Sequence, residues 1–221
     1  MAKQKLSSEE SSIVVEFDSV KLEGNLVIPK GAEGIVLFAH GSGSSRFSPR
    51  NQYVARVLQD VNLGTLLIDL LTVVEEEIDL RTAEYRFDID LLAERLTGAV
   101  DWLTTNPVTQ DLKIGCFGAS TGAAAALIAA AERPDDVFAV VSRGGRPDLA
   151  VQVLHSVLAP TFLIVGGDDY QVIELNKEAL NLINAEKELV LVPGATHLFE
   201  EPGALEEVAR LSADWFAGHL K

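Results

Sequence analysis

The segment Cys116-Phe117-Gly118-Ala119-Ser120-Thr121-Gly122 places a serine between two glycines where two runs of different character meet. Residues 111–117 have the apolar composition of a buried parallel strand, and the alanine-rich residues 123–131 favour a helix. A sharp strand-to-helix turn at Ser120 needs small neighbours, which the glycines supply. Such a turn pushes the hydroxyl out of the sheet at a helix N-terminus, where developing negative charge is favoured. We interpret the segment as a nucleophile elbow; the alternative is a glycine-rich strand end without chemistry.

The composition is that of one acidic α/β domain. With 221 residues the chain is long enough for a single sizeable core and short for two. The formal charge of -15 argues against nucleic acid or an anionic membrane surface as a partner, because both would repel it. The one cysteine, Cys116, can form neither an internal disulfide nor a cysteine-type zinc site, and its place in an apolar run predicts a packing role.

Polar and apolar runs lead to expectations about domain limits and location. Residues 1–11 are polar, lack an apolar targeting core and are predicted to be a flexible N-terminal segment. Residues 12–221 are predicted to form a single domain. No apolar run approaches the length of a membrane span, so we expect a cytoplasmic protein.

Predicted strands and helices alternate along most of the chain. Residues 12–18 and 20–29 alternate apolar and polar positions around a short turn, which predicts an antiparallel hairpin at a sheet edge. Further buried strands are predicted over residues 34–40, 64–70, 111–117, 137–142, 161–165 and 188–192. Helices are predicted over residues 49–62, 82–105, 123–131, 148–158, 171–184 and 203–220, and an acidic loop at Glu75, Glu76, Glu77 and Asp79. This pattern predicts an α/β fold with a mostly parallel sheet, helices on both faces and no large cap domain.

A serine nucleophile needs a base, which should follow a later strand at the carboxyl edge of the sheet. His197 follows the predicted strand over residues 188–192 and is the predicted base. His155 and His219 lie where a solvated or helix-end role is expected.

The base needs an orienting carboxylate, and the reaction needs donors for an oxyanion. Asp168 and Asp169 follow the predicted strand over residues 161–165, and either can orient the histidine while the other caps the next helix. The predicted oxyanion hole consists of the backbone amides of Thr121, directly after the serine, and Ser42 in a glycine-rich loop. That loop lacks the Gly-Lys-Ser/Thr ending of a P-loop, which disfavours a phosphate-binding role for it.

Four stretches carry a resemblance to a known family: Phe38-Ala-His-Gly-Ser-Gly-Ser-Ser-Arg46 with Ser48-Pro-Arg-Asn51, Gly118-Ala-Ser-Thr-Gly122, Gly166-Gly-Asp-Asp-Tyr-Gln-Val172 and Ala195-Thr-His197. With these stretches, and with the chain order serine, aspartate, histidine, the chain from about Val20 onward resembles the α/β-hydrolase superfamily, and within it the dienelactone hydrolase-like group. In that family the acid lies three residues before a valine, which selects Asp169 before Val172 and leaves Asp168 in reserve. Dienelactone hydrolase itself uses a cysteine nucleophile, so Ser120 favours a general ester, thioester or small-acyl substrate.

Four arginines share a predicted place on carboxyl-edge loops of this acidic chain: Arg46, Arg50, Arg143 and Arg146. An arginine there can hold a substrate carboxylate with two parallel hydrogen bonds, which makes Arg46, Arg143 and Arg146 possible substrate-binding residues. The alternative is that Arg143 or Arg146 fixes neighbouring loops through ion pairs with acidic residues at 75–79 or 200–201.

These features predict a cofactor-independent serine hydrolase that cleaves a small ester, lactone or thioester through an acyl-enzyme on Ser120. No metal is expected, and the expected partner is a small-molecule substrate, with no nucleic acid and no membrane. The alternative is a ligand-sensing module that keeps the fold without the chemistry. A lyase or perhydrolase reaction on the same three residues is a further alternative.

Overall fold

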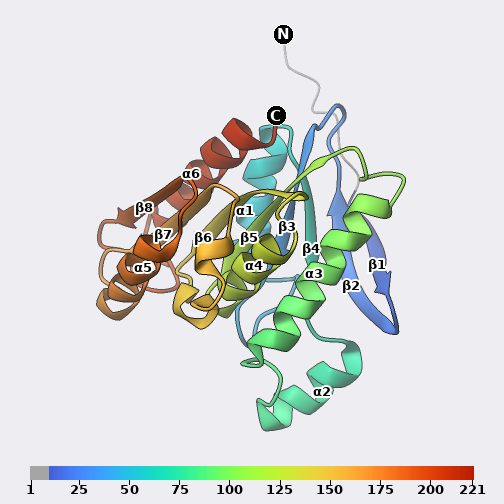
Figure 1. Ribbon diagram of the computed structural model, residues 1–221, viewed down its shortest axis with the longest axis horizontal. Coiled ribbons are helices and arrows are strands. Elements are labelled where there is room, and N and C mark those ends of the chain that lie inside the picture. Colours follow the sequence, from blue (N-terminus) through green and yellow to red (C-terminus); the bar gives the residue numbers. More distant parts are fainter. Residues whose placement is uncertain (1–9) are drawn as a thin grey trace.

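The computed structural model describes residues 10–221, and an eight-stranded sheet runs through its centre (Figure 1). The strands are β1 (Ser11–Phe17), β2 (Val20–Val27), β3 (Gly34–Ala39), β4 (Gly64–Ile68), β5 (Lys113–Ala119), β6 (Val137–Arg143), β7 (Thr161–Gly166) and β8 (Lys187–Val192). β3, β4 and β7 are buried along their whole length, which explains why they read as continuous apolar runs in the sequence.

The strand order is β1-β2-β4-β3-β5-β6-β7-β8. β2 pairs antiparallel with β1 and with β4, and every other neighbouring pair is parallel. The β1–β2 hairpin turns at Asp18, whose φ is 48°, and brings Phe17 opposite Val20. The predicted edge hairpin and mostly parallel sheet are therefore confirmed. Because the parallel strands run in one direction, the loops that follow them gather at one edge.

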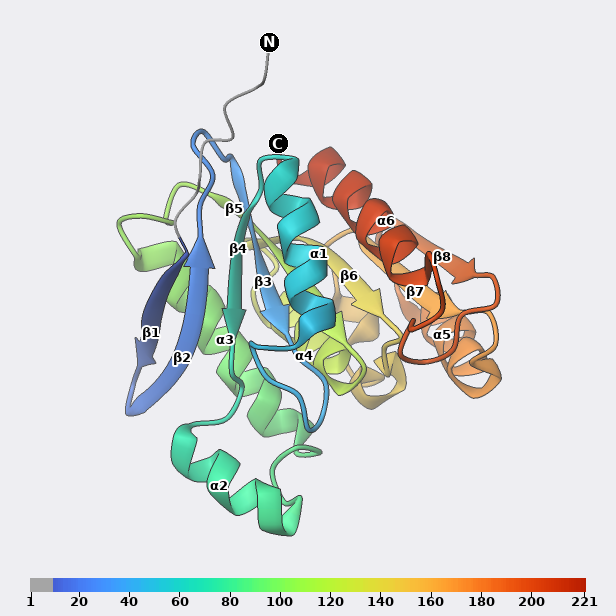
Figure 2. The ribbon, with the colours of Figure 1, turned by 180° about the vertical axis from the view of Figure 1, so that it is seen from behind.

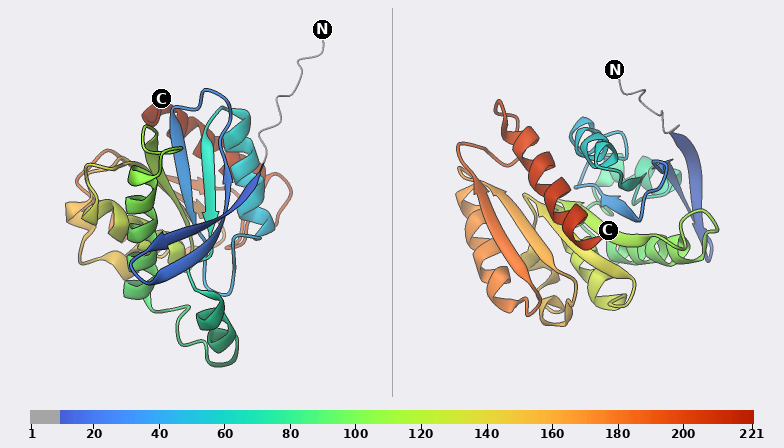
Figure 3. Two further views of the ribbon diagram at one scale, coloured as in Figure 1. Left: turned by 90° about the vertical axis from the view of Figure 1, so that its right-hand side faces the viewer. Right: turned by 90° about the horizontal axis from the view of Figure 1, so that it is seen from above.

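Helices cover both faces of the sheet (Figures 2 and 3). The helices are α1 (Pro49–Asp60), α2 (Val73–Thr82), α3 (Ile89–Thr105), α4 (Thr121–Glu132), α5 (Tyr170–Leu182) and α6 (Ala204–His219). α1 and α6 lie together on one face, whereas α3, α4 and α5 lie on the other. Phe38, Phe117 and Phe216 belong to the core under α1 and α6, and Leu96 and Leu127 belong to the core on the opposite face.

The acidic segment that the sequence predicts as a loop is a helix, α2, and this corrects the prediction. The hydroxyl of Thr72 accepts a hydrogen bond from the amide of Glu75, and the carboxylate of Glu75 accepts one from the amide of Thr72. Acidic residues in a first turn stabilise a helix, because they face the positive end of its dipole. Helix α2 stands apart from the main layers, below α3 in Figure 1.

Helix α3 begins at Ile89, later than the predicted start near residue 82. Helix α2 ends at Thr82, because Ala83 after it has a left-handed φ of 55° and does not continue the helix. The buried carboxylate of Asp79 then holds the connecting turn by accepting hydrogen bonds from the amide and side chain of Arg86. Asp88 starts the new helix as its N-cap.

The predicted helix over residues 148–158 is replaced by two short 3-10 turns, Pro147–Ala150 and Leu154–Ser156. Ala150, Leu154 and Val157 have helical spacing and are all buried, which is why the sequence suggests a helix. Two separate turns bury the same three side chains without a continuous helix. No cap domain lies between β6 and β7.

Two further expectations concern the chain as a whole. Most of the segment predicted to be flexible, residues 1–11, lies outside the described residues, and β1 begins at Ser11. Within residues 10–221, every helix is too short or too polar to cross a bilayer.

Cys116 is fully buried in β5, and burial raises the pKa of its thiol to about 12, which keeps the thiol protonated.

Candidate active site

Ser120 lies at the turn between β5 and α4 with a φ of 52° and a ψ of −120°. This backbone conformation is strained for a residue that carries a side chain. A Cβ atom on Gly118 would lie 2.3 Å from the Cα of Ala123, and one on Gly122 would lie 2.4 Å from the carbonyl oxygen of Ala39. Only glycine fits these two positions, and the turn has the geometry of a strand-to-helix elbow.

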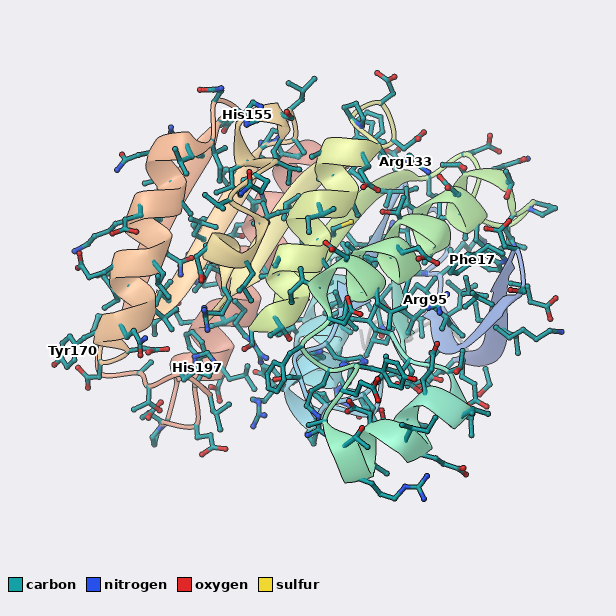
Figure 4. All side chains as sticks on the ribbon, turned by 60° about the horizontal axis from the view of Figure 1, so that its bottom comes forward. Phe17, Arg95, Arg133, His155, Tyr170 and His197 are labelled. Atoms are coloured by element: carbon teal, nitrogen blue, oxygen red, sulfur yellow. The ribbon has the colours of Figure 1, made fainter. Side chains whose placement is uncertain are left out.

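The imidazole of His197 contacts the carboxylate of Asp169. His197 Nδ1 lies 2.7 Å from Asp169 Oδ2, and because a carboxylate only accepts, Nδ1 carries the hydrogen. Asp169 occupies the N-cap position of α5 without bonding a helix amide, so its carboxylate serves the histidine instead. The carboxylate of Asp168 instead accepts a hydrogen bond from the hydroxyl of Tyr170 at 3.5 Å. Figure 4 shows His197 at the sheet edge near Tyr170, the first residue of α5.

The loop that carries His197 packs tightly against the end of β7. A Cβ atom on Gly166 would lie 2.4 Å from the carbonyl oxygen of Ala195. The hydroxyl of Thr196 donates to the carboxylate of Glu201 at 2.6 Å, and the Thr196 amide donates to it at 3.1 Å. The hydrogen bond from the Thr196 hydroxyl holds the pKa of Glu201 below its usual value. Glu201 thus fixes the loop beside His197. This role is not predicted from the sequence, where Glu201 is considered only as a partner for an arginine.

The end of β6 lies between the serine and the histidine. The amide of Ser120 donates to the carbonyl oxygen of Arg143 at 3.2 Å. A Cβ atom on Gly144 would lie 3.6 Å from Cε1 of the His197 ring. Since Arg143 and Gly144 are neighbours in the chain, these contacts bring Ser120 and His197 to the same corner of the sheet.

The two predicted oxyanion residues contact each other. The amide of Ser42 donates to the hydroxyl of Thr121 at 2.9 Å. His40 holds the start of this loop, because its Nε2 accepts from the amide of Leu70 at 3.1 Å and its Nδ1 donates to the carbonyl oxygen of Gly41 at 2.9 Å. Burial lowers the pKa of His40 and keeps the ring neutral. In the resting structure, the Ser42 amide is therefore already engaged.

Three of the four carboxyl-edge arginines form ion pairs. Arg46 pairs with Asp69 and Glu23, Arg146 binds Asp148 through two hydrogen bonds of 2.8 Å, and Arg50 pairs with Glu200 at 3.3 Å. Arg143 differs, because within residues 10–221 no hydrogen bond or ion pair to its buried side chain is found. The alternative pairing of Arg143 or Arg146 with residues 75–79 does not occur, since Arg95 binds Glu75 and Arg86 binds Asp79.

The assembled groups suit proton transfer to and from a serine hydroxyl. Ser120, Asp169 and His197 lie on loops after β5, β7 and β8, at the carboxyl edge where parallel sheets hold their ligands. Over residues 10–221, no group of three or more His, Cys, Asp or Glu side chains is placed to hold a metal ion. The chemistry available from the protein itself is that of a nucleophile with an oriented base.

Comparison with known proteins places the chain in a family. A family model described as the dienelactone hydrolase family matches residues 79–217, a range that includes Ser120, Asp169 and His197. The chain belongs to the dienelactone hydrolase family. A crystal structure of dienelactone hydrolase from Anabaena variabilis is 65% identical and superposes with a TM-score of 0.96, over 96% of this chain and 99% of that one. Est1E from Butyrivibrio proteoclasticus, at 15% identity, covers 94% of this chain and 98% of its own with a TM-score of 0.78. The fold is the α/β-hydrolase fold, and the family supports hydrolase activity.

Two curated relatives carry a different name. Proteins from two strains of Mycobacterium tuberculosis, each named "Putative phosphoribosyl transferase", are 56% identical to this chain over 215 residues. The match covers 97% of this chain but 47% of each relative. The chain therefore spans about half the length of the curated relatives it matches, and their name describes the whole of those longer proteins.

Proposed function

We propose that this chain is a cofactor-independent serine hydrolase that cleaves a small ester, lactone or thioester through an acyl-enzyme on Ser120. The observation that carries the proposal is the 2.7 Å contact between His197 Nδ1 and Asp169 Oδ2, next to the strained turn at Ser120. A histidine oriented by a carboxylate is what a serine hydroxyl needs to become a nucleophile.

In the proposed mechanism, His197 moves a proton in each half of the reaction. Its Nε2 takes the proton of Ser120 as the serine oxygen attacks the substrate carbonyl carbon. Asp169 holds the Nδ1 hydrogen and stabilises the imidazolium that forms. The histidine then gives the proton to the departing alcohol or thiol, which leaves an acyl-enzyme. A water molecule, deprotonated by the same histidine, releases the acid and restores the hydroxyl.

The oxyanion of each tetrahedral intermediate accepts hydrogen bonds from the amides of Thr121 and Ser42 in this proposal. In the resting state the Ser42 amide bonds the neutral hydroxyl of Thr121. Hydrogen bonds to a charged acceptor are about twice as strong as those to a neutral one, so the oxyanion replaces the hydroxyl as the acceptor. The interaction then favours the transition state over the bound substrate, which is the condition for catalysis.

A fluorophosphonate probe tests the proposal directly. We expect covalent labelling of Ser120, located by mass spectrometry, that disappears in Ser120→Ala and falls steeply in His197→Ala and Asp169→Asn. Asp168→Asn is the matched control, because it alters the neighbouring carboxylate and should label as the wild type does. A folded wild-type chain that resists labelling would point to a ligand-sensing role instead.

The name of the Mycobacterium relatives supplies a second candidate, phosphoribosyl transfer. Ser120, Asp169 and His197 lie in the part of this chain that matches those relatives, and the match covers 47% of their length. We therefore assign ester hydrolysis to this half. Release of pyrophosphate from phosphoribosyl diphosphate by this chain alone, retained in Ser120→Ala, would favour the second candidate.

A further inference from the structure

Among residues 10–221, the side chain of Arg143 is buried without a partner. It is 8% exposed, and its Nε and Nη1 atoms are buried without a hydrogen bond. By contrast, the comparably buried Arg95 pairs with Glu75 and Glu94. A buried guanidinium without acceptors is costly, because it has left water without replacing its hydrogen bonds. Burial lowers the pKa of Arg143 to about 10, which still leaves the group positively charged at neutral pH.

Arg143 ends β6 beside the proposed nucleophile. Its carbonyl oxygen accepts from the amide of Ser120, and the residue pairs with Ala119 of β5. Side chains alternate along a strand, so Arg143 points to the same face as Val141, which packs in the core under α1 and α6. Helix α1 carries Arg50 in its first turn on this face.

Arg50 is a second cation close to Arg143. Arg50 lies in the first turn of α1, the helix that covers the face to which Arg143 points. The positive charge of Arg50 also lowers the pKa of Arg143, as a smaller cause than burial. The Nε atom of Arg50 is buried without a hydrogen bond to any described residue, and its Nη1 lies 3.3 Å from Glu200. The Glu200 side chain is 66% exposed, so water screens much of this pair. Glu200 therefore neutralises the positive charges of Arg50 and Arg143 only weakly.

We propose that Arg143 and Arg50 bind an anionic group of the substrate, next to the ester bond that Ser120 attacks. The proposal rests on the hydrolase function proposed for the same site. An anion at this point supplies acceptors for N–H groups that lack them and separates the two positive charges. The two guanidinium groups carry two positive charges, and the carboxylate of Glu200, which pairs with Arg50, is exposed to water. Charge balance therefore favours a dianion, and we assign a phosphate monoester in preference to a carboxylate.

Three p-nitrophenyl esters with the same butanoyl chain test this assignment. The chain ends in a methyl group, in a carboxylate (the glutarate monoester) or in a phosphate (the 4-phosphonooxybutanoate). We expect kcat/KM for the phosphate ester to exceed that for the neutral ester by about tenfold or more, the effect of one hydrogen bond to a charged group. Arg143→Met should bring this ratio close to one, and Arg143→Lys should restore part of it.

Arg210→Gln is the control for these ratios, because Arg210 lies on α6 in an exposed pair with Glu207 and should leave them unchanged. A ratio that survives Arg143→Met overturns the subsite. A clear preference for the glutarate monoester over the phosphate ester overturns the choice of a phosphate. Circular dichroism of each variant shows that lost selectivity is not lost folding.

A binding test separates the subsite from the chemistry. We expect inorganic phosphate, compared with chloride at equal ionic strength, to raise the Tm of Ser120→Ala and to have no such effect after Arg143→Met is added. A phosphate shift in a chain that hydrolyses no ester would refute the hydrolase and leave the anion site. Neutral-ester hydrolysis with neither a phosphate shift nor charge selectivity would refute the anion site and leave the hydrolase.

Discussion

The backbone amide of Ser42 donates a hydrogen bond to the hydroxyl of Thr121 at 2.9 Å, which ties the loop after β3 to the elbow. In the proposed mechanism the oxyanion displaces this hydroxyl as the acceptor of the Ser42 amide, so removing the hydroxyl should speed the reaction. We expect Thr121→Val to raise kcat by about two- to tenfold, the equivalent of a net hydrogen bond of about 0.5–1.5 kcal/mol. Thr121→Ser keeps the hydroxyl and should match the wild type.

Steady-state hydrolysis of a p-nitrophenyl ester measures this effect. A loss of about a hundredfold or more in Thr121→Val would show that the hydroxyl itself donates to the oxyanion. This outcome would refute the hypothesis that the oxyanion displaces the Thr121 hydroxyl. It would still be consistent with Ser42 and Thr121 as the oxyanion hole.

The choice between the two neighbouring aspartates is testable by paired substitutions. Asp169→Asn removes the acceptor that fixes the His197 tautomer, and kcat should fall by about 10⁴-fold, as in comparable triads. Asp168→Asn should change kcat less than about threefold, because its carboxylate contacts Tyr170 and not His197. Equal losses in the two variants, measured on the same ester, would contradict the assignment of Asp169.

The elbow should tolerate no side chain at Gly118. A Cβ atom there would lie 2.3 Å from backbone atoms of α4, so Gly118→Ala should destabilise the fold by about 1–3 kcal/mol or more. Gly218→Ala in α6 is the matched control, since nothing lies within 4 Å of its Cβ position and alanine favours a helix. Urea unfolding should show a lower midpoint for the first variant and an equal or higher one for the second.

The stability of the fold should depend on pH through His40. Burial lowers its pKa in the folded state, so the unfolded chain takes up a proton near pH 6.5 before the folded chain does. Unfolding therefore becomes easier as the pH falls below that value, by up to about 1.4 kcal/mol per pH unit for one histidine, whereas above it the contribution is constant.

Urea unfolding between pH 8 and pH 5 measures this dependence. His40→Gln should flatten the decline below pH 6.5, while His155→Gln, at an exposed position, should keep the wild-type slope. Parallel declines in all three proteins would rule out His40 as the source.

Much of the fold is predictable because buried parallel strands are continuous apolar runs with turn residues at their ends. The failures occur where local chemistry outweighs composition. The acidic run at Glu75 looks like a loop, yet its reciprocal cap with Thr72 starts a helix. The spacing of Ala150, Leu154 and Val157 looks helical, yet two short turns bury the same side chains.

The candidate site is predictable to the level of loops and not of contacts. Strand order and chain order place Ser120 and His197 at one edge, because both follow parallel strands. Whether each arginine is paired depends on which acidic side chain the fold brings next to it. Arg146 binds Asp148, two residues away, whereas Arg143 has no acidic partner in the part of the chain that the structure describes. The engagement of the Ser42 amide likewise depends on a side-chain rotamer that no spacing reveals.

The burial of Cys116 gives the chain an internal reporter of global opening. This thiol is fully buried in a central strand, so alkylating reagents cannot reach it in the native protein. Burial also raises its pKa to about 12, so the reactive thiolate does not form at neutral pH. Because it is the one cysteine of the sequence, each alkylated molecule records a passage through a state in which β5 has left the sheet. Timed iodoacetamide trapping therefore measures the lifetime of the folded core without any added label.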